Sequence, residues 1–386
     1  MGRWAVLSLL VSLTACGGDD QSGGSALAGG ASGSGGVGAS AGSGGTGGSA
    51  GASSGGSAGA GASGGTPSVQ KGIWSSAAEL AQKPMSGSGW TTLTSFADGD
   101  TSTPNVSNQD DATNIRVLAA AIVYARSGTA SYKDKVVAAC EKVIGTEKGG
   151  RSLAWGRETG AYAMAADLVG FRTPAFEAWL HQVADVEKCS ELGITLREMF
   201  EKRPNNWGSM AFGSLTAIDR YLGDDAALAA LRDYWVLGVT GPNPGLKYDA
   251  DVSWHVDPNS LRLINPKGAM KQGVDIDGII PDDMRRGASF TTGAPVFTGY
   301  PWEHLQGVLM AARVLERAGM PIWSVDDQAI RRAGHALQVR LGGQWVASGD
   351  DRWQLAFFDQ AYSSTWSGTT DVWGAGKNAG FAYVLP

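Results

Sequence analysis

Apolar residues recur at helical spacing in one segment after another of this 386-residue chain, whereas the alternation typical of strands is scarce. Most of the segments are separated by Gly, Pro, Asp or Asn, the residues that end helices. We expect helices at 111–124, 132–144, 156–169, 174–186, 195–200, 207–222, 226–236, 304–318 and 326–339. Short strands are expected only near the C-terminus, at 353–358 and 381–384. The predicted class is therefore mainly α with minor β near the C-terminus.

Successive helices joined by short turns fit either a solenoid or a closed ring of helical hairpins. The sequence has no repeat of fixed period that would favour the solenoid. One long region, 238–299, is rich in Gly and Pro and poor in helical patterns. Loops of this length in a compact domain usually carry function. This one also gathers basic side chains, among them Lys267, Arg285 and Arg286.

The first residues are typical of a bacterial lipoprotein signal. Arg3 precedes an apolar run that ends in Leu13-Thr14-Ala15-Cys16, and the run is much shorter than the roughly 20 residues that span a bilayer. We expect a signal peptide at 1–16 whose cleavage leaves Cys16 as the lipidated N-terminus. The alternative is a free cysteine after an ordinary signal peptide. The expected location is a membrane-anchored exported lipoprotein that faces the periplasm or the cell surface.

Residues 17–67 are almost wholly Gly, Ser and Ala. Such a segment lacks the apolar residues that offset the entropy cost of ordering, so we expect a flexible tether with a reach of roughly 40 Å. The remaining residues, 68–386, suffice for a large core. No second linker interrupts them, which indicates one folded domain.

The formal net charge of −6 argues against nucleic acid as a partner, and it requires an anionic ligand to meet a locally basic cleft. Cys140 and Cys189 are compatible with a disulfide or with two buried thiols. The sequence lacks the His and Cys spacings of zinc sites, and we predict neither a metal nor a cofactor. A calcium site around Asp249, Asp251 and Asp257 stays open.

Two adjacent asparagines, Asn205 and Asn206, precede the helix expected at 207–222. Asparagine is a good helix cap, which is the structural interpretation of the pair. Amide donors can also bind a ligand carboxylate, and donors aimed at a carboxylate stabilise negative charge that develops on it. Asn206 is the first choice for this role.

Three segments together resemble the alginate lyase superfamily of polysaccharide lyases: Arg203-Pro204-Asn205-Asn206-Trp207-Gly208, Asp277-Gly278-Ile279-Ile280-Pro281-Asp282-Asp283-Met284-Arg285-Arg286 and Tyr300-Pro301-Trp302-Glu303-His304-Leu305. The resemblance implies an (α/α) toroid, an incomplete barrel of helices. It also implies cleavage of alginate or glucuronan by β-elimination, which leaves 4,5-unsaturated uronate ends. Many family members have His after the paired asparagines, where this chain has Trp207. Lys377-Asn378 resembles the family's closing segment and is given no role.

The resemblance implies that Tyr300 donates a proton to the leaving oxygen and, as phenolate, removes the alpha proton. A phenol with an ordinary pKa of about 10 needs nearby positive charge to act as a base, which Arg286 or His255 would supply. His255 would also replace the missing family histidine. The structural interpretations stay open: packing for Tyr300, a hydrogen bond to Asp257 for His255, and a surface ion pair for Arg286.

Further residues are expected to contact the substrate, an anionic uronic-acid polysaccharide, and the protein is expected to act as a monomer. Tryptophan faces can stack on sugar rings, although each of these tryptophans also suits a core or a cleft wall. Arg285 could exchange roles with Arg286, and His304 is the substitute for Tyr300. The substrate-binding set is Asn205, Trp207, Trp254, Arg285, Trp302 and His304.

Two other functions are compatible with the sequence. A helical toroid can carry an inverting glycoside hydrolase, with Asp283 and Glu303 as base and acid. A surface lipoprotein can instead bind polysaccharide through its tryptophans without cleaving it. The sequence leaves open the choice among mannuronate, guluronate and glucuronate, the endo or exo mode, and the membrane that holds the anchor.

Overall fold

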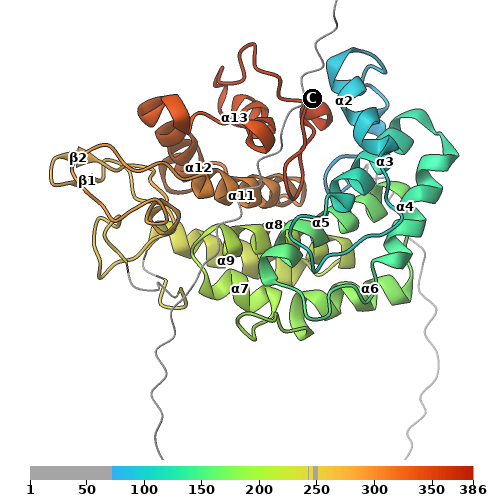
Figure 1. Ribbon diagram of the computed structural model, residues 1–386, viewed down its shortest axis with the longest axis horizontal. Helices are drawn as coiled ribbons and strands as arrows, with labels where there is room; N and C mark the ends of the chain where they lie inside the picture. The colour runs from blue at the N-terminus through green and yellow to red at the C-terminus, as the bar shows by residue number, and fades with distance from the viewer. Residues whose placement is uncertain (1–71, 242, 247–250, 386) are drawn as a thin grey trace, which may run out of the picture. The chain divides into compact units, whose positions relative to one another are not determined.

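The computed structural model describes residues 72–241, 243–246 and 251–385, which lie within the compact unit Thr66–Pro386. The fold is mainly α, as predicted (Figure 1). The expected signal peptide, the lipidation site Cys16 and the expected tether lie outside the described residues. The helices are α1 (Ala77–Leu80), α2 (Gly87–Asp98), α3 (Thr113–Ser127), α4 (Ala130–Lys142), α5 (Ser152–Val169), α6 (Pro174–His181), α7 (Leu196–Lys202), α8 (Asn206–Leu222), α9 (Asp225–Thr240), α10 (Pro281–Met284), α11 (Tyr300–Arg317), α12 (Val325–His335) and α13 (Trp353–Tyr362).

The helix ends follow local capping chemistry. Thr195 and Glu198 form a capping box at the start of α7, and Pro174 occupies the first turn of α6. Asn205 caps α8, because its side-chain oxygen accepts a hydrogen bond from the Trp207 backbone N–H at 3.1 Å. Gly170 ends α5 in the left-handed conformation, with φ of 66°.

Helices α5 and α8 run parallel and in close contact. Ser214 Oγ of α8 donates to the Gly156 carbonyl at 2.7 Å and accepts from the Gly160 N–H at 2.9 Å. A Cβ atom on Gly156 would lie 2.9 Å from the Ala211 nitrogen. Residue numbers therefore rise together along the two helices, and the missing side chains let their backbones approach.

Helices α8 and α11 pack in the same parallel way. A Cβ atom on Gly307 would collide with the Ser209 carbonyl, and one on Gly213 would lie 3.2 Å from the Met310 sulfur. The chain must therefore return between these helices. Parallel packing brings the first turns of α8 and α11 to the same end of the fold, near the first part of α5.

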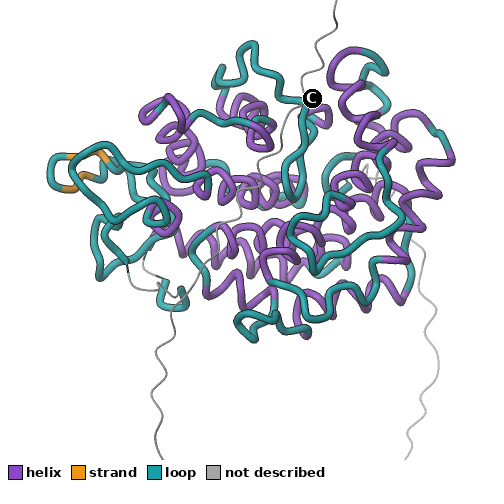
Figure 2. The backbone as a smooth tube through the Cα atoms, in the orientation of Figure 1, coloured by secondary structure: helices purple, strands orange, loops and turns teal. Residues whose placement is uncertain are grey.

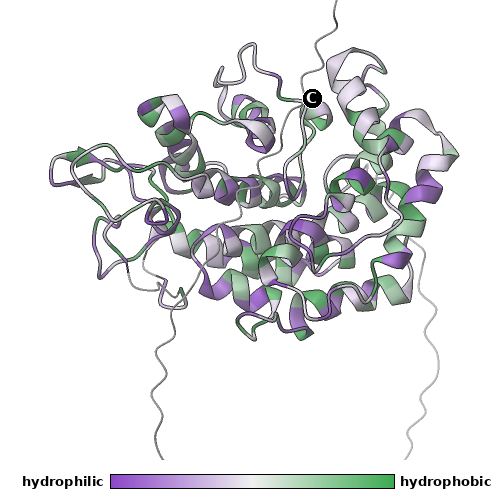
Figure 3. Ribbon diagram, viewed as in Figure 1, coloured by the Kyte–Doolittle hydropathy of each residue, from purple (hydrophilic) through white to green (hydrophobic). Residues whose placement is uncertain are grey.

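Other helices surround this central row. α3 packs on α5 and α2 on α3, while α4 contacts both α3 and α5. α7 and α9 pack on α8, and α12 contacts α9 and α11 (Figure 1). Figure 3 shows hydrophobic and hydrophilic residues side by side on the turns of single helices. The buried core is one continuous cluster that runs from Ile73 to Leu385.

The strand predictions were wrong. Residues 353–358 form the first part of α13, and 381–384 fall in and beside a single 3₁₀ turn, η5 (Ala382–Val384). Trp353 and Phe357 pack edge to face one helical turn apart, with ring centroids separated by 5.1 Å. Among the described residues, the only paired strands are β1 (Met270–Lys271) and β2 (Val274–Asp275), an antiparallel hairpin within the long loop (Figure 2).

Two expected helices end in wider turns. The helix expected at 174–186 is α6 followed by the π-helical η1 (Gln182–Val186), and that at 326–339 is α12 followed by the π-helical η2 (Ala336–Leu341). Two further 3₁₀ turns, η3 (Gly343–Trp345) and η4 (Gly349–Asp351), lead into α13. None of the described helices is both long enough and apolar enough to cross a membrane.

Cys140 and Cys189 do not form a disulfide. Both are free thiols in the core, which agrees with the alternative of two buried cysteines. Burial raises the pKa of the Cys140 thiol well above its ordinary value. A buried thiol that stays protonated is a poor nucleophile, so Cys140 has a packing role.

Candidate active site

The parallel packing of α5, α8 and α11 brings two polar side chains to one carboxylate, and a third reaches it from the C-terminal segment after α13. Glu303 Oε2, in the first turn of α11, accepts hydrogen bonds from Arg157 Nη2 at 2.7 Å and from Asn206 Nδ2 at 2.9 Å. Glu303 Oε1 pairs with Lys377 Nζ at 2.5 Å. The N-terminal ends of helices favour negative charge, so the position of Glu303 at two such ends suits an anion.

These cations control the ionisation of Glu303. Burial alone would raise its pKa, but the charges of Arg157 and Lys377 and the hydrogen bonds from Lys377 and Asn206 outweigh burial and lower the pKa to about 2. Only 15% of the Glu303 side chain is exposed. Glu303 is therefore an ionised carboxylate at neutral pH, held by strong partners.

Arg286 connects Tyr300 to the side chains around Glu303. Its Nη1 atom donates to Asn206 Oδ1 at 3.2 Å, and its Cζ atom lies 3.4 Å from the centroid of the Tyr300 ring. Tyr300 and Arg286 are both half-buried, so each keeps some contact with solvent. We call the polar cluster the set of Arg157, Asn206, Arg286, Tyr300, Glu303 and Lys377.

The adjacent Arg285 differs from Arg286, because it pairs with a carboxylate outside the polar cluster. Its Nε atom pairs with Asp282 Oδ1 at 2.5 Å. Asp283, in the same short helix α10, is fully buried between α8 and α11: its oxygens accept from the Asn206 N–H at 3.0 Å and contact His304 Nδ1 at 2.9 Å. This double contact fixes α10 and thereby the position of Arg286.

Asn206 is a buried member of the polar cluster. The residue is fully buried, and both ends of its amide are engaged, one with Glu303 and the other with Arg286. The expected direct contact with a substrate carboxylate is therefore corrected to a positioning role. Asn205 acts as the helix cap of the structural interpretation and is 7% exposed.

His255 lies in the long loop, beside Lys271 of the β1–β2 hairpin. It is 1% exposed, and its carbonyl oxygen accepts from Lys271 Nζ at 2.7 Å. Burial, followed by the charge of Lys271, lowers the pKa of His255 to about 4. A neutral imidazole carries no charge that could neutralise a polymer carboxylate at neutral pH, so the cationic role expected of His255 is corrected, and its role as a base stays a prediction.

Two of the expected sugar-stacking residues belong to the core. Trp254 donates its indole N–H to the Ala288 carbonyl at 2.8 Å, and Trp302 donates to the Trp345 carbonyl at 2.7 Å. Each ring is less than 5% exposed. Trp207, which follows Asn206 in the sequence, is half-buried and packs against the core. His304 is buried against Asp283, which removes it as a substitute for Tyr300.

Arg157 was not predicted, and Lys377 was noted without a role. Arg157 is 146 residues away from Glu303 in the sequence, so no local motif connects them. One signal was available: Arg157 and Glu158 interrupt an otherwise apolar and small-residue run in a helix that is buried on nearly every side. Charged residues in such a helix require partners, which predicts a polar site around them.

The described part of the chain has no group of three or more His, Cys, Asp or Glu side chains placed to hold a metal ion. Of the residues considered for calcium, Asp249 lies outside the described residues. Asp251 accepts from the Ser253 N–H at 2.7 Å and from Ser289 Oγ at 2.8 Å, and Asp257 caps a turn at Asn259.

Comparison with protein-family models finds no family that matches this chain, and comparison with curated proteins finds no match either. The assignment of function therefore depends on the chemistry of the polar cluster.

Proposed function

We propose that this protein is a polysaccharide lyase that cleaves a uronic-acid polymer, alginate or glucuronan, by β-elimination. The observation that carries the proposal is the half-buried phenol of Tyr300 beneath the Arg286 guanidinium, with Cζ 3.4 Å from the ring centroid. The guanidinium places a positive charge against the ring, and both side chains keep some contact with solvent. A phenol in this setting is suited to exchange a proton with a sugar.

The elimination balances without water, a metal or an oxidant. The Tyr300 phenolate takes the proton at C5 of the uronate, the C4–O bond breaks, and the C4=C5 double bond forms. The phenol then gives this proton to the leaving oxygen and returns to phenolate. Lys377, whose side chain is 36% exposed, and Arg286 supply positive charge for the uronate carboxylate as its charge increases.

Asn206, Glu303 and Arg157 are proposed to position the other members of the polar cluster. Asn206 holds Arg286 and Glu303 in place, and Glu303 in turn fixes the Lys377 ammonium on one side and Arg157 on the other. A rigid supporting layer of this kind is what a preorganised site requires. The half-buried Trp207, which follows Asn206 in the sequence, is the ring proposed to stack on a sugar.

The burial of two carboxyl groups weighs against the hydrolase alternative. An inverting hydrolase needs a carboxylic acid to protonate the leaving group and a carboxylate to activate water. The pKa of Glu303 is about 2, so it is ionised and cannot act as the acid at neutral pH. Asp283 has no exposed surface, and water cannot reach it in this conformation.

The proposal includes the finer architecture and the setting. The parallel row of α5, α8 and α11, with outer helices packed on it, supports an incomplete (α/α) toroid. The N-terminal sequence supports export as a lipoprotein anchored through Cys16. The proposed protein acts as a monomer on an anionic polysaccharide, without a cofactor.

Mass spectrometry of the products tests the reaction type. The protein is incubated with alginate and, separately, with glucuronan. A lyase yields oligosaccharides one water lighter than the products of hydrolysis. Products at the hydrolysis mass would establish the glycoside hydrolase, and binding without new products from either polymer would establish the binding protein.

A further inference from the structure

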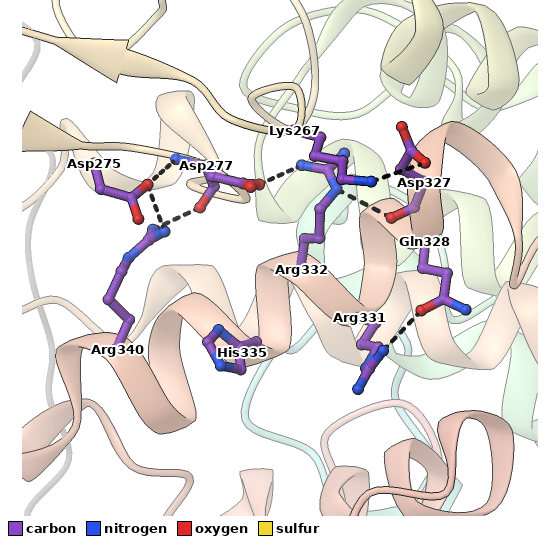
Figure 4. Close-up of a pocket in the computed structure, with 9 residues that line it drawn as sticks. All are labelled: Lys267, Asp275, Asp277, Asp327, Gln328, Arg331, Arg332, His335 and Arg340. Carbon is purple, nitrogen blue, oxygen red and sulfur yellow. Dashed lines mark hydrogen bonds and ion pairs between the residues drawn. The ribbon is translucent and has the colours of Figure 1, made fainter.

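A second charged site lies between the β1–β2 hairpin and α12 (Figure 4). It is a hollow of about 400 Å³ whose lining includes five basic side chains: Lys267, Arg331, Arg332, His335 and Arg340. The polar cluster contributes no residue to it. The loop that holds Asp277 continues directly into α10 and Arg286, so the hollow and the polar cluster share one connecting segment.

The floor of the hollow is built from paired charges. Arg332 Nη1 donates to the Asn265 carbonyl at 2.7 Å and to Asp277 Oδ1 at 2.6 Å, and Arg340 Nη1 donates to Asp275 Oδ1 at 2.8 Å. These bonds join α12 and η2 to the hairpin loop on the opposite wall (Figure 4). The site is therefore formed before any ligand arrives.

Two basic groups on the rim have no carboxylate partner among the described residues. The Arg331 guanidinium donates to the neutral Gln328 Oε1 at 3.1 Å. His335 lies one helical turn further on, and its ring centroid is 6.3 Å from that of Trp366. Both side chains are exposed, and Lys267 stands on the opposite wall with an exposed partner, Asp327, at 3.3 Å.

A strained turn forms part of the wall. Asp326, Asp327 and Gln328 are all left-handed, with φ of 48°, 51° and 61°. Residues in this conformation are strained and persist where their surroundings hold them. Here Arg332 holds them, because its Nη2 and Nε donate to the Asp326 and Asp327 carbonyls at 2.9 and 3.2 Å. The turn presents Gln328 to Arg331.

We propose that this hollow binds the carboxylate of a sugar acid. The lining holds four Arg and Lys side chains and three Asp carboxylates, and Arg332 also pairs with Asp326 Oδ2 at 2.8 Å. The charge left for a ligand is therefore that of Arg331, whose guanidinium has no carboxylate partner among the described residues. Arginine binds carboxylates in bidentate geometry. The Asp carboxylates can accept hydrogen bonds from sugar hydroxyls, whereas they would repel a compact dianion such as sulfate. The choice of uronate rests on the proposed function.

The histidines make the test specific to this site. The chain has four histidines, and only His335 lines the hollow, so its imidazole NMR signals report local binding. The full-length protein is titrated with sodium D-glucuronate, D-glucose and sodium sulfate. We expect glucuronate to shift the His335 signals, glucose to leave them unchanged, and sulfate to bind more weakly than glucuronate.

Arg331→Gln should raise the Kd for glucuronate at least tenfold. Arg232→Gln is the matched control, because Arg232 is a half-buried arginine of α9 that pairs with Asp233, and this change should leave the Kd unchanged. Equal binding by wild type and Arg331→Gln would overturn the proposal. So would an unmoved His335 signal, an equal response to glucose, or tighter binding of sulfate.

Failure of this inference is distinguishable from failure of the lyase proposal. Arg331→Gln should keep the elimination activity on a polymer at saturation, and Tyr300→Phe should keep the glucuronate shift at His335. Glucuronate binding without any elimination would refute the lyase alone. Elimination without glucuronate binding at His335 would refute this site alone.

Discussion

Glu303→Gln removes the one negative charge that Arg157 and Lys377 share. At pH 7 the lowering of the Glu303 pKa from 4.5 to about 2 corresponds to about 3 kcal/mol of folding free energy. Removing one partner from a buried ion pair generally costs about 3–5 kcal/mol, which agrees with the value of about 3 kcal/mol obtained from the pKa. The Arg157 side chain is only 6% exposed, so water cannot replace the lost carboxylate.

The lowered pKa of Glu303 also predicts in which direction the stability difference changes with pH. A carboxylate with a lowered folded-state pKa stabilises the fold above its unfolded pKa and loses this contribution as pH falls. The difference in unfolding free energy between wild type and Glu303→Gln should therefore shrink from about 3 kcal/mol at pH 7 to about 1.5 kcal/mol at pH 3.

Urea unfolding at several pH values, followed by circular dichroism, measures both quantities. Asp233→Asn is the control, because Asp233 pairs with Arg232 at 2.6 Å and the two side chains are 70% and 35% exposed. It should change stability by less than about 1 kcal/mol. A Glu303→Gln protein as stable as wild type at pH 7, or a difference that does not shrink in acid, would refute the charge-cluster reasoning.

Four further outcomes follow from the structure. Gly307→Ala places a Cβ against the Ser209 carbonyl and should destabilise the fold by about 3 kcal/mol in urea unfolding, whereas Gly374→Ala, with open space around it, should be neutral. Lys377→Gln should lower kcat/KM for the polymer by about 10- to 100-fold without unfolding the protein, and an unchanged value would remove Lys377 from the site. Because the pKa of His255 is lowered to about 4, wild type should lose about 2 kcal/mol of stability between pH 8 and pH 5, and His255→Gln should lose correspondingly less over this range; identical pH profiles would contradict the buried neutral imidazole. Asn205→Ala should cost about 1 kcal/mol of stability and leave the elimination rate unchanged, since Asn205 is the α8 cap.

The helices were predictable because their signals are local. The segment 207–222 shows helical periodicity and begins after a capping asparagine, and α8 covers Asn206–Leu222. The run at 353–358 predicts a strand from alternation over only six residues, and so short a run cannot be told from part of a buried helix, here α13. The Gly-mediated parallel packing of α5, α8 and α11 depends on contacts between distant residues.

The site was predictable only in part, for the same reason. Motifs in three segments named Asn206, Arg286 and Tyr300, and the structure brings these residues together. Their burial could not be read from motifs, which is why Asn206 was expected at the surface. Arg157 reaches Glu303 across 146 residues, a contact that only the helix packing creates.

The most direct test of the account follows the ultraviolet absorbance of the conjugated unsaturated uronate during incubation with alginate and with glucuronan. We expect the absorbance to rise when the wild-type protein is incubated with at least one of the two polymers. We also expect that Tyr300→Phe, which keeps the ring beneath Arg286 and removes only the hydroxyl, lowers the rate by at least about 100-fold. Absorbance that rises equally with Tyr300→Phe, or that never rises with wild type, would contradict the account.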